Sequence, residues 1–82
     1  MRKKHPVLIQ LGQNIVSVRK SRKWSQEELA LEANIDRTYI GGIERGERNV
    51  AVLNLCKIAK TLQVKPSILL KGLELTEDKN SN

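Results

Sequence analysis

Residues 26–45 read QEELALEANIDRTYIGGIER, and the order of residues within them predicts two short helices joined by a turn. Ser25 stands directly before it and Glu28 follows three residues later, which is the spacing of a capping box at a helix start. Asp36 is expected to cap a second helix, and Asn34 suits a left-handed turn between the two. Two helix starts this close together predict a short helix, a tight turn and another short helix.

The apolar residues of this stretch are spaced as two crossed helices require, with a small residue, Ala30, at the expected crossing point. The positions expected to be buried are Leu29, Ala33, Ile35, Ile40 and Ile43. The outer face of the second helix keeps donors and small residues, namely Arg37, Thr38, Gly41, Gly42 and Arg45, with Tyr39 at its edge. Such a face suits a helix that enters the major groove of DNA, so residues 26–45 are predicted to form a helix-turn-helix.

The flanking sequence is also helical in its periodicity. Before the motif, four apolar residues recur at helical spacing behind Pro6: Leu8, Leu11, Ile15 and Val18. After the motif, a fourth helix is expected from about Val52 to Leu62, with Val52, Leu55, Ile58, Ala59 and Leu62 facing inward. Cys56 is expected to be a small core or near-core residue, and a short fifth helix is expected from Pro66 to just before Gly72. The predicted fold class is therefore all-α, a compact domain of five helices.

The length of 82 residues predicts a single domain. We expect a basic arm at residues 1–5, a folded core at about 6–72 and a polar tail at 76–82. The single cysteine excludes an internal disulfide and fits a reducing cytoplasm, and no apolar run is long enough to span a membrane. The sequence contains no nucleophile–base pair, metal-ligand spacing or phosphate loop. No catalytic residue, metal, cofactor or small-molecule ligand is therefore predicted.

Positive charge is concentrated near the N-terminus. The formal net charge is +6, and residues 1–24 hold seven of the fifteen Lys and Arg residues and no acid. A one-sided excess of this kind is typical of a surface that faces phosphates, although a solvated helix end would have the same composition. Aromatic residues make up only 2% of the chain, which argues against binders that stack single-stranded bases.

Over residues 11–70 the chain resembles the Cro and lambda-repressor (XRE-type) helix-turn-helix regulators. The stretches DRTYIGGIERGERN (36–49), LG (11–12) and KIAKTL (57–62) are most similar to the controller proteins of restriction–modification systems. This resemblance implies a cytoplasmic, bacterial or phage homodimer that binds paired operator half-sites on double-stranded DNA. It also implies control of the protein's own gene and of the endonuclease gene, with RNA polymerase as a further candidate partner.

The same resemblance implies roles for individual residues. Base or groove-shape reading is implied for Arg37, Thr38, Tyr39, Arg45 and Arg48, and phosphate contact for Gln26, Asn49 and Arg19. Lys23 is a further phosphate candidate because it lies in the basic run at the end of the first helix, where a solvated charge is the alternative. The dimer surface of the family lies on the fourth and fifth helices, where the candidates are Leu53, Ile68, Leu69 and Leu70. Glu44 is expected to be structural and to pair with a nearby arginine, whereas Arg37 could alternatively be a solvated partner of Glu44 or Glu47.

Three positions depart from the family pattern. Gly41 stands where a serine is usual, Ala51 lacks the side chain that would cap the fourth helix, and Gln63 replaces the glycine that would end it. Two other functions remain open. One is a phage-type or antitoxin-type repressor of the same fold, and the other is a protein–protein interaction module that does not read DNA. The polar outer face of the motif argues against the second.

Overall fold

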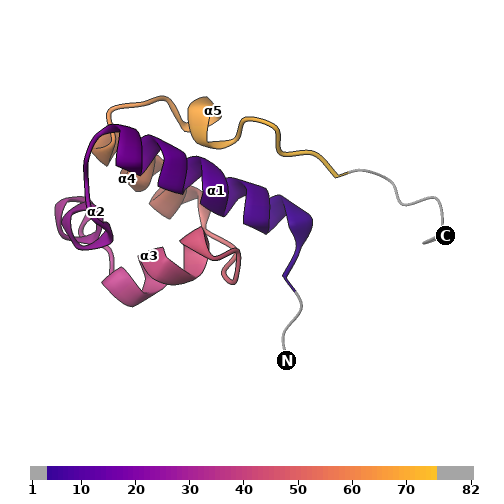
Figure 1. Ribbon diagram of the computed structural model, residues 1–82, viewed down its shortest axis with the longest axis horizontal. Helices are drawn as coiled ribbons and strands as arrows, with labels where there is room; N and C mark the ends of the chain where they lie inside the picture. The colour runs from indigo at the N-terminus through magenta and orange to yellow at the C-terminus, as the bar shows by residue number, and fades with distance from the viewer. Residues whose placement is uncertain (1–3, 76–82) are drawn as a thin grey trace, which may run out of the picture.

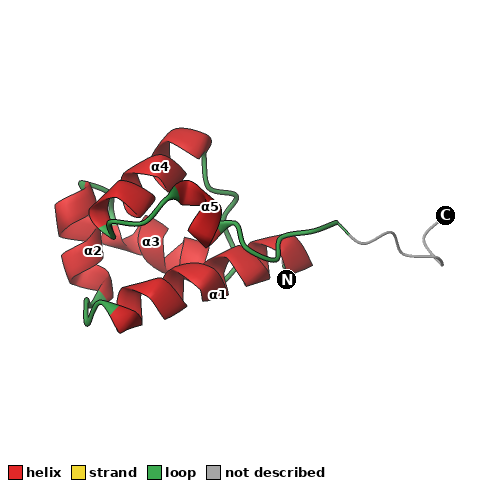
Figure 2. Cartoon of the chain, turned by 90° about the horizontal axis from the view of Figure 1, so that it is seen from above, coloured by secondary structure: helices red, strands yellow, loops and turns green. Residues whose placement is uncertain are grey.

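Five α-helices follow one another in the structure, which is a computed structural model that describes residues 4–75 (Figure 1). They are α1 (Pro6–Ser21), α2 (Gln26–Ala33), α3 (Arg37–Glu44), α4 (Val52–Thr61) and α5 (Pro66–Leu69). Within the described residues there is no strand (Figure 2). The predicted all-α class with five helices is confirmed. The predicted polar tail and the first three residues of the basic arm lie outside the described residues.

The helix starts follow local rules. Pro6 occupies the first turn of α1, and the Nδ1 atom of His5 accepts a hydrogen bond from the backbone of Val7 at 3.1 Å. At α2 the predicted capping box is confirmed. The hydroxyl of Ser25 accepts from the N–H of Glu28 at 3.0 Å, and the Glu28 carboxylate accepts from the N–H of Ser25 at 2.7 Å. Asp36 is at the N-cap position of α3, as predicted, but its side chain makes no capping hydrogen bond, so the predicted side-chain cap is wrong.

We expect Ser25→Ala to lower the free energy of unfolding by about 1 kcal/mol, because it leaves the Glu28 amide without its side-chain acceptor. Urea denaturation of the variant and the parent measures the difference. Ser17→Ala is the matched control, since Ser17 is exposed in the middle of α1, where alanine is the better helix former. Equal stability of the Ser25→Ala variant and the parent would show that the capping box contributes nothing.

In the described part of the chain, three residues other than glycine have a positive φ angle near helix ends. Asn34 has a φ of 57°, as predicted for the turn between α2 and α3. Gln63 reaches 61° although it lacks the freedom of glycine. Two backbone hydrogen bonds hold it there, from Gln63 to Lys60 and from Val64 to Ala59, both at 3.0 Å. The backbone thus ends α4 without the expected glycine.

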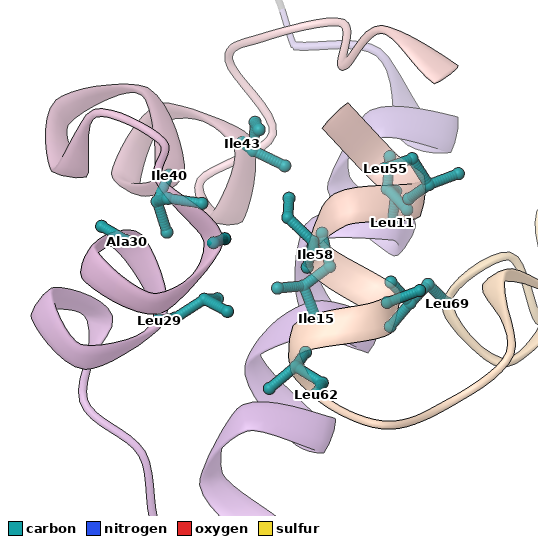
Figure 3. Close-up of a cluster of buried hydrophobic side chains, with 12 residues drawn as sticks. Leu11, Ile15, Leu29, Ala30, Ile40, Ile43, Leu55, Ile58, Leu62 and Leu69 are labelled. Carbon is teal, nitrogen blue, oxygen red and sulfur yellow. The ribbon is translucent and has the colours of Figure 1, made fainter. Parts of the chain in front are cut away.

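The hydrophobic core is formed by side chains from all five helices (Figure 3). Leu29 and Ile40 of the helix-turn-helix point toward Ile15 of α1 and Ile58 of α4, and all four are fully buried. Among residues 4–75 the buried apolar side chains of this core are Leu11, Ile15, Leu29, Ala30, Ala33, Ile40, Ile43, Leu55, Ile58, Ala59, Leu62 and Leu69. Through this core α2 packs against α3 and α4, and α3 also packs against α1.

Two residues predicted for the inner face of α4 are on its outside. Val52 is 73% exposed and Cys56 is also exposed. The two lie four residues apart on one side of the helix, whereas Leu55, Ile58 and Leu62 occupy the side that meets the core. The set of residues predicted to face inward on this helix was therefore too large. None of the described helices combines the length and the apolar character that crossing a membrane would require.

Candidate nucleic-acid interface

The second helix of the motif, α3, packs against α1 and α2. In Figure 1, α3 and α5 lie on opposite sides of α1. Arg37 and Thr38 are exposed at the start of α3, whereas Tyr39 is half-buried and packs against the core. Ile40 and Ile43 face inward. Of the predicted outer face, Arg37, Thr38 and Arg45 are exposed, with Tyr39 at the edge. The prediction is wrong for Gly41 and Gly42, which are buried.

A buried ion pair lies directly behind this face. Arg19 of α1 binds Glu44 of α3 through two hydrogen bonds, Nε to Oε2 at 2.7 Å and Nη2 to Oε1 at 2.9 Å. The two side chains are only 10% and 3% exposed. The remaining guanidinium nitrogen, Nη1, donates to the backbone oxygen of Trp24 at 2.9 Å. The predicted structural role of Glu44 is confirmed.

The phosphate contact predicted for Arg19 is corrected by this geometry. Arg19 belongs to the same basic run as Lys20, Arg22 and Lys23, and composition does not distinguish them. Its position on the side of α1 that meets α3 turns the guanidinium inward, where Glu44 and Trp24 take up all three of its nitrogens. Two signals were available. Arg19 follows Leu11 and Ile15 at helical spacing, which places it on their buried face, and Glu44 is an acid on a helix otherwise expected to face DNA.

Gln26 connects the buried pair to the surface. Its Nε2 donates to Glu44 Oε1 at 2.7 Å, and its Oε1 accepts from Arg37 Nη1 at 3.3 Å. The amide can have only this orientation, because a carboxylate only accepts hydrogen bonds and a guanidinium only donates them. One hydrogen of Nε2 remains for a phosphate. Arg37 is therefore held by an amide, and within residues 4–75 it makes no ion pair with Glu44 or Glu47.

The loop after α3 gathers three basic side chains around one acid. Arg45 Nε lies 3.1 Å from Glu47 Oε1, and Lys4 Nζ lies 3.8 Å from Glu47 Oε2. The pKa of Glu47 is below its ordinary value, mainly because Arg45 donates a hydrogen bond to it, with further positive charge from Lys4 and Arg48. Glu47 is therefore ionised at neutral pH. Arg45 is therefore paired with Glu47 when no DNA is bound, which the sequence did not reveal.

The remaining predicted DNA contacts are exposed, but on different segments. Arg48 and Asn49 are exposed in the loop between α3 and α4. Lys23 is exposed in the turn between α1 and α2, where its φ angle is 62°. Nearby Arg22 is committed to structure, since its Nε donates to the backbone oxygen of Leu62 at 2.7 Å.

The apolar residues predicted for a dimer surface divide into two groups. Leu53 of α4 is 79% exposed, and Ile68 and Leu70 are 46% and 41% exposed. Leu69 is fully buried in the core of its own protomer, so its predicted part in a dimer surface is corrected. Successive residues of a helical turn point about 100° apart, which is why one of three adjacent apolar residues faces inward. Val52 adds to the exposed set.

Known proteins similar to this chain include a helix-turn-helix family and several controller proteins. Residues 15–69 match the helix-turn-helix family. Control protein C.BamHI of Bacillus amyloliquefaciens is 50% identical over 60 residues, which are 72% of this chain and 74% of that protein. The crystal structure of the restriction-modification controller protein C.AhdI from Aeromonas hydrophila is 40% identical with a TM-score of 0.78, over 79% of this chain and 98% of that one. The controller protein C.Esp1396I, crystallised as a tetramer in complex with its natural 35 base-pair operator, is 36% identical with a TM-score of 0.76, over 85% of this chain and 92% of that one.

Proposed function

Because the chain belongs to the helix-turn-helix family, with restriction–modification controller proteins among its relatives, we propose that it binds paired operator half-sites as a homodimer. In this role it is a sequence-specific DNA-binding transcription regulator of the controller type. It acts in the bacterial cytoplasm on the promoters of its own gene and of the endonuclease gene, where RNA polymerase is a further partner.

The observation that carries this proposal is the support behind the reading face. Arg37 is held by Gln26, which is held by Glu44, and Glu44 is fixed by the buried guanidinium of Arg19. A side chain that is already oriented loses less conformational freedom when it binds. Such a chain of hydrogen bonds suits an arginine that donates to a base in the major groove, where a guanine presents two acceptors.

The other proposed contacts follow from exposure and chemistry. Arg48 reads a base from the loop, and Thr38 and Tyr39 contact base edges or sense the shape of the groove. Phosphates are bound by the free amide hydrogen of Gln26 and by exposed side chains, namely Asn49 and Lys23. Arg45 also contacts phosphate in this proposal, where DNA phosphate competes with Glu47 for the guanidinium of Arg45.

The helices α4 and α5 pack against each other in the protomer. The proposed dimer surface comprises exposed apolar residues on these helices and at the end of α5, namely Val52, Leu53, Ile68 and Leu70. A protomer of this size has a small core and gains stability from a partner subunit. A two-fold axis through this surface would place the half-sites about one DNA turn apart, roughly 34 Å, on a near-palindromic operator.

A mobility-shift titration of DNA from upstream of the gene tests the proposal. We expect discrete complexes whose affinity falls log-linearly with salt concentration, with a slope of about −0.9 for each phosphate neutralised. Analytical ultracentrifugation should give two protomers for each half-site pair. Equal affinity for upstream DNA and for a random duplex would refute sequence-specific reading.

We expect Arg37→Ala to weaken binding to the preferred sequence by about 1–3 kcal/mol and to relax selectivity at one base position. Arg37→Lys is the matched control, because lysine keeps the charge but lacks the planar fork of donors. The lysine variant should keep the salt dependence of the parent and still lose selectivity at that base. If Arg37→Ala binds preferred and random duplexes as the parent does, Arg37 does not read a base.

A further inference from the structure

Gly42 is buried although it lies on the face of α3 that was predicted to be outermost. The side chain of Arg48, from the following loop, covers it. A Cβ atom added at Gly42 would lie 2.7 Å from Cγ of Arg48, 3.4 Å from Nε and 3.6 Å from Cδ. The aliphatic stem of Arg48 thus occupies the place where any other residue at position 42 would have its own side chain.

The backbone of the loop is fixed on both sides of this contact. The N–H of Glu47 donates to the backbone oxygen of Gly42 at 2.8 Å, and the N–H of Gly46 donates to Ile43 at 3.0 Å. Gly46 has a φ of 79° and approaches α1 so closely that a Cβ there would lie 2.9 Å from the Cα of Ile9. The loop backbone next to Arg48 is therefore held against both α3 and α1.

We propose that Gly42 is a positioning residue for Arg48, and that the missing side chain makes a loop arginine part of the reading face of α3. This inference rests on the proposed function, in which Arg48 reads a base. The loop backbone fixes the position of the Cα atom of Arg48, and contact with the α3 backbone at Gly42 fixes the direction of the aliphatic part of its side chain. Arg48 then loses less rotamer freedom on binding DNA, as Arg37 does through its hydrogen bond to Gln26.

The neighbouring glycine provides a matched contrast. A Cβ at Gly41 would lie 3.1 Å from Nη1 of Arg45 and 3.7 Å from Oε1 of Gln26. Nη1 is the far end of a flexible, exposed side chain, which can move away at little cost. At Gly42 the atom met first is Cγ, close to the backbone, so an added methyl group must turn the whole Arg48 side chain aside.

A double-mutant cycle tests the proposal. The probes are duplexes that the parent selects from a random-sequence library, together with an unselected random duplex. Arg48→Ala should weaken binding to the selected duplex by about 5- to 150-fold. Gly42→Ala should weaken it by at least about 5-fold and relax selectivity at the same base position. Its thermal midpoint should not fall, because alanine is a better helix former than glycine. The double variant should bind no more weakly than Arg48→Ala alone, and Gly41→Ala should combine additively with Arg48→Ala.

Two results would overturn the inference while leaving the proposed function intact. One is parental affinity and selectivity in Gly42→Ala. The other is an equal loss from Gly42→Ala whether or not Arg48 is present, which would mean that the added methyl group acts on the DNA directly. If the parent selects no sequence at all, the proposed function fails and the inference with it. A separate readout uses the free parent protein, in which the Nε–H order parameter of Arg48 should exceed about 0.6. A lower value would contradict a held side chain.

Discussion

Glu44→Ala is expected to lower the free energy of unfolding by about 3–5 kcal/mol. Its carboxylate accepts both hydrogen bonds from Arg19 and one from Gln26, and its side chain is only 3% exposed. Removing it leaves a guanidinium buried without a counter-charge. A chain of 82 residues has a total stability of roughly 4–12 kcal/mol. The variant should therefore be partly unfolded at 37 °C, as urea denaturation followed by circular dichroism can measure.

Glu47→Ala is the matched control, because the same side chain is removed three residues later from an exposed site. Its effect on stability should be within about 0.5 kcal/mol. A second variant, Arg19→Met combined with Glu44→Leu, removes both charges and should recover most of the stability lost in Glu44→Ala. This double variant should still bind DNA more weakly than the parent, because Gln26 loses the carboxylate that orients it toward Arg37. If Glu44→Ala is as stable as Glu47→Ala, the buried pair does not stabilise the fold.

Gly12→Val is expected to lower the free energy of unfolding by more than about 3 kcal/mol. A Cβ at Gly12 would lie 2.5 Å from the backbone oxygen of Glu44 and 2.6 Å from that of Ile43. Both atoms belong to the end of α3 and cannot rotate away, so α1 and α3 would have to separate. Overpacking of this kind costs about 1–3 kcal/mol for a single methyl group, and valine adds two more at the same place.

Gly12→Ala should accordingly give an intermediate loss of about 1–3 kcal/mol, measured in the same urea titration. Gln13→Val, at the next and exposed position of α1, is the matched control and should cost only a few tenths of a kcal/mol through helix propensity. Similar stabilities for Gly12→Val and Gln13→Val would mean that α1 can move away from α3 freely. Because that movement would also separate Arg19 from Glu44, DNA binding should fall along with stability in the Gly12 series.

Much of the fold could be predicted from the sequence because its signals are local. Ser25 and Glu28 are three residues apart, and the capping box that they predict forms as expected. Asn34 has the predicted left-handed conformation, and the helical periodicity correctly places Leu29, Ile40 and Ile58 in the core. The interaction that starts or ends a helix involves residues within one turn of each other, so the sequence contains it in full.

The site was less predictable because its support comes from distant segments. Arg19 and Glu44 are 25 residues apart, and the packing of α1 on α3 turns Arg19 inward while Lys23 stays exposed. Leu69 enters the core while Ile68 and Leu70 remain outside, for the same reason. Helical spacing places Arg19 on the same face as Leu11 and Ile15, but only the tertiary structure supplies the buried partner that a charged residue needs there.

Signals that lie within one or two helical turns of each other were enough to predict the five helices, the helix-turn-helix and the polar character of its outer face. Which arginines remain free to meet DNA, and what holds them, depends on how the helices pack. Gly12 and Gly42 show why, since each glycine matters only through an atom of another segment that occupies the space of its missing side chain. Helix formation depends on neighbours along the chain, whereas the orientation of Arg37 and Arg48 depends on neighbours in space.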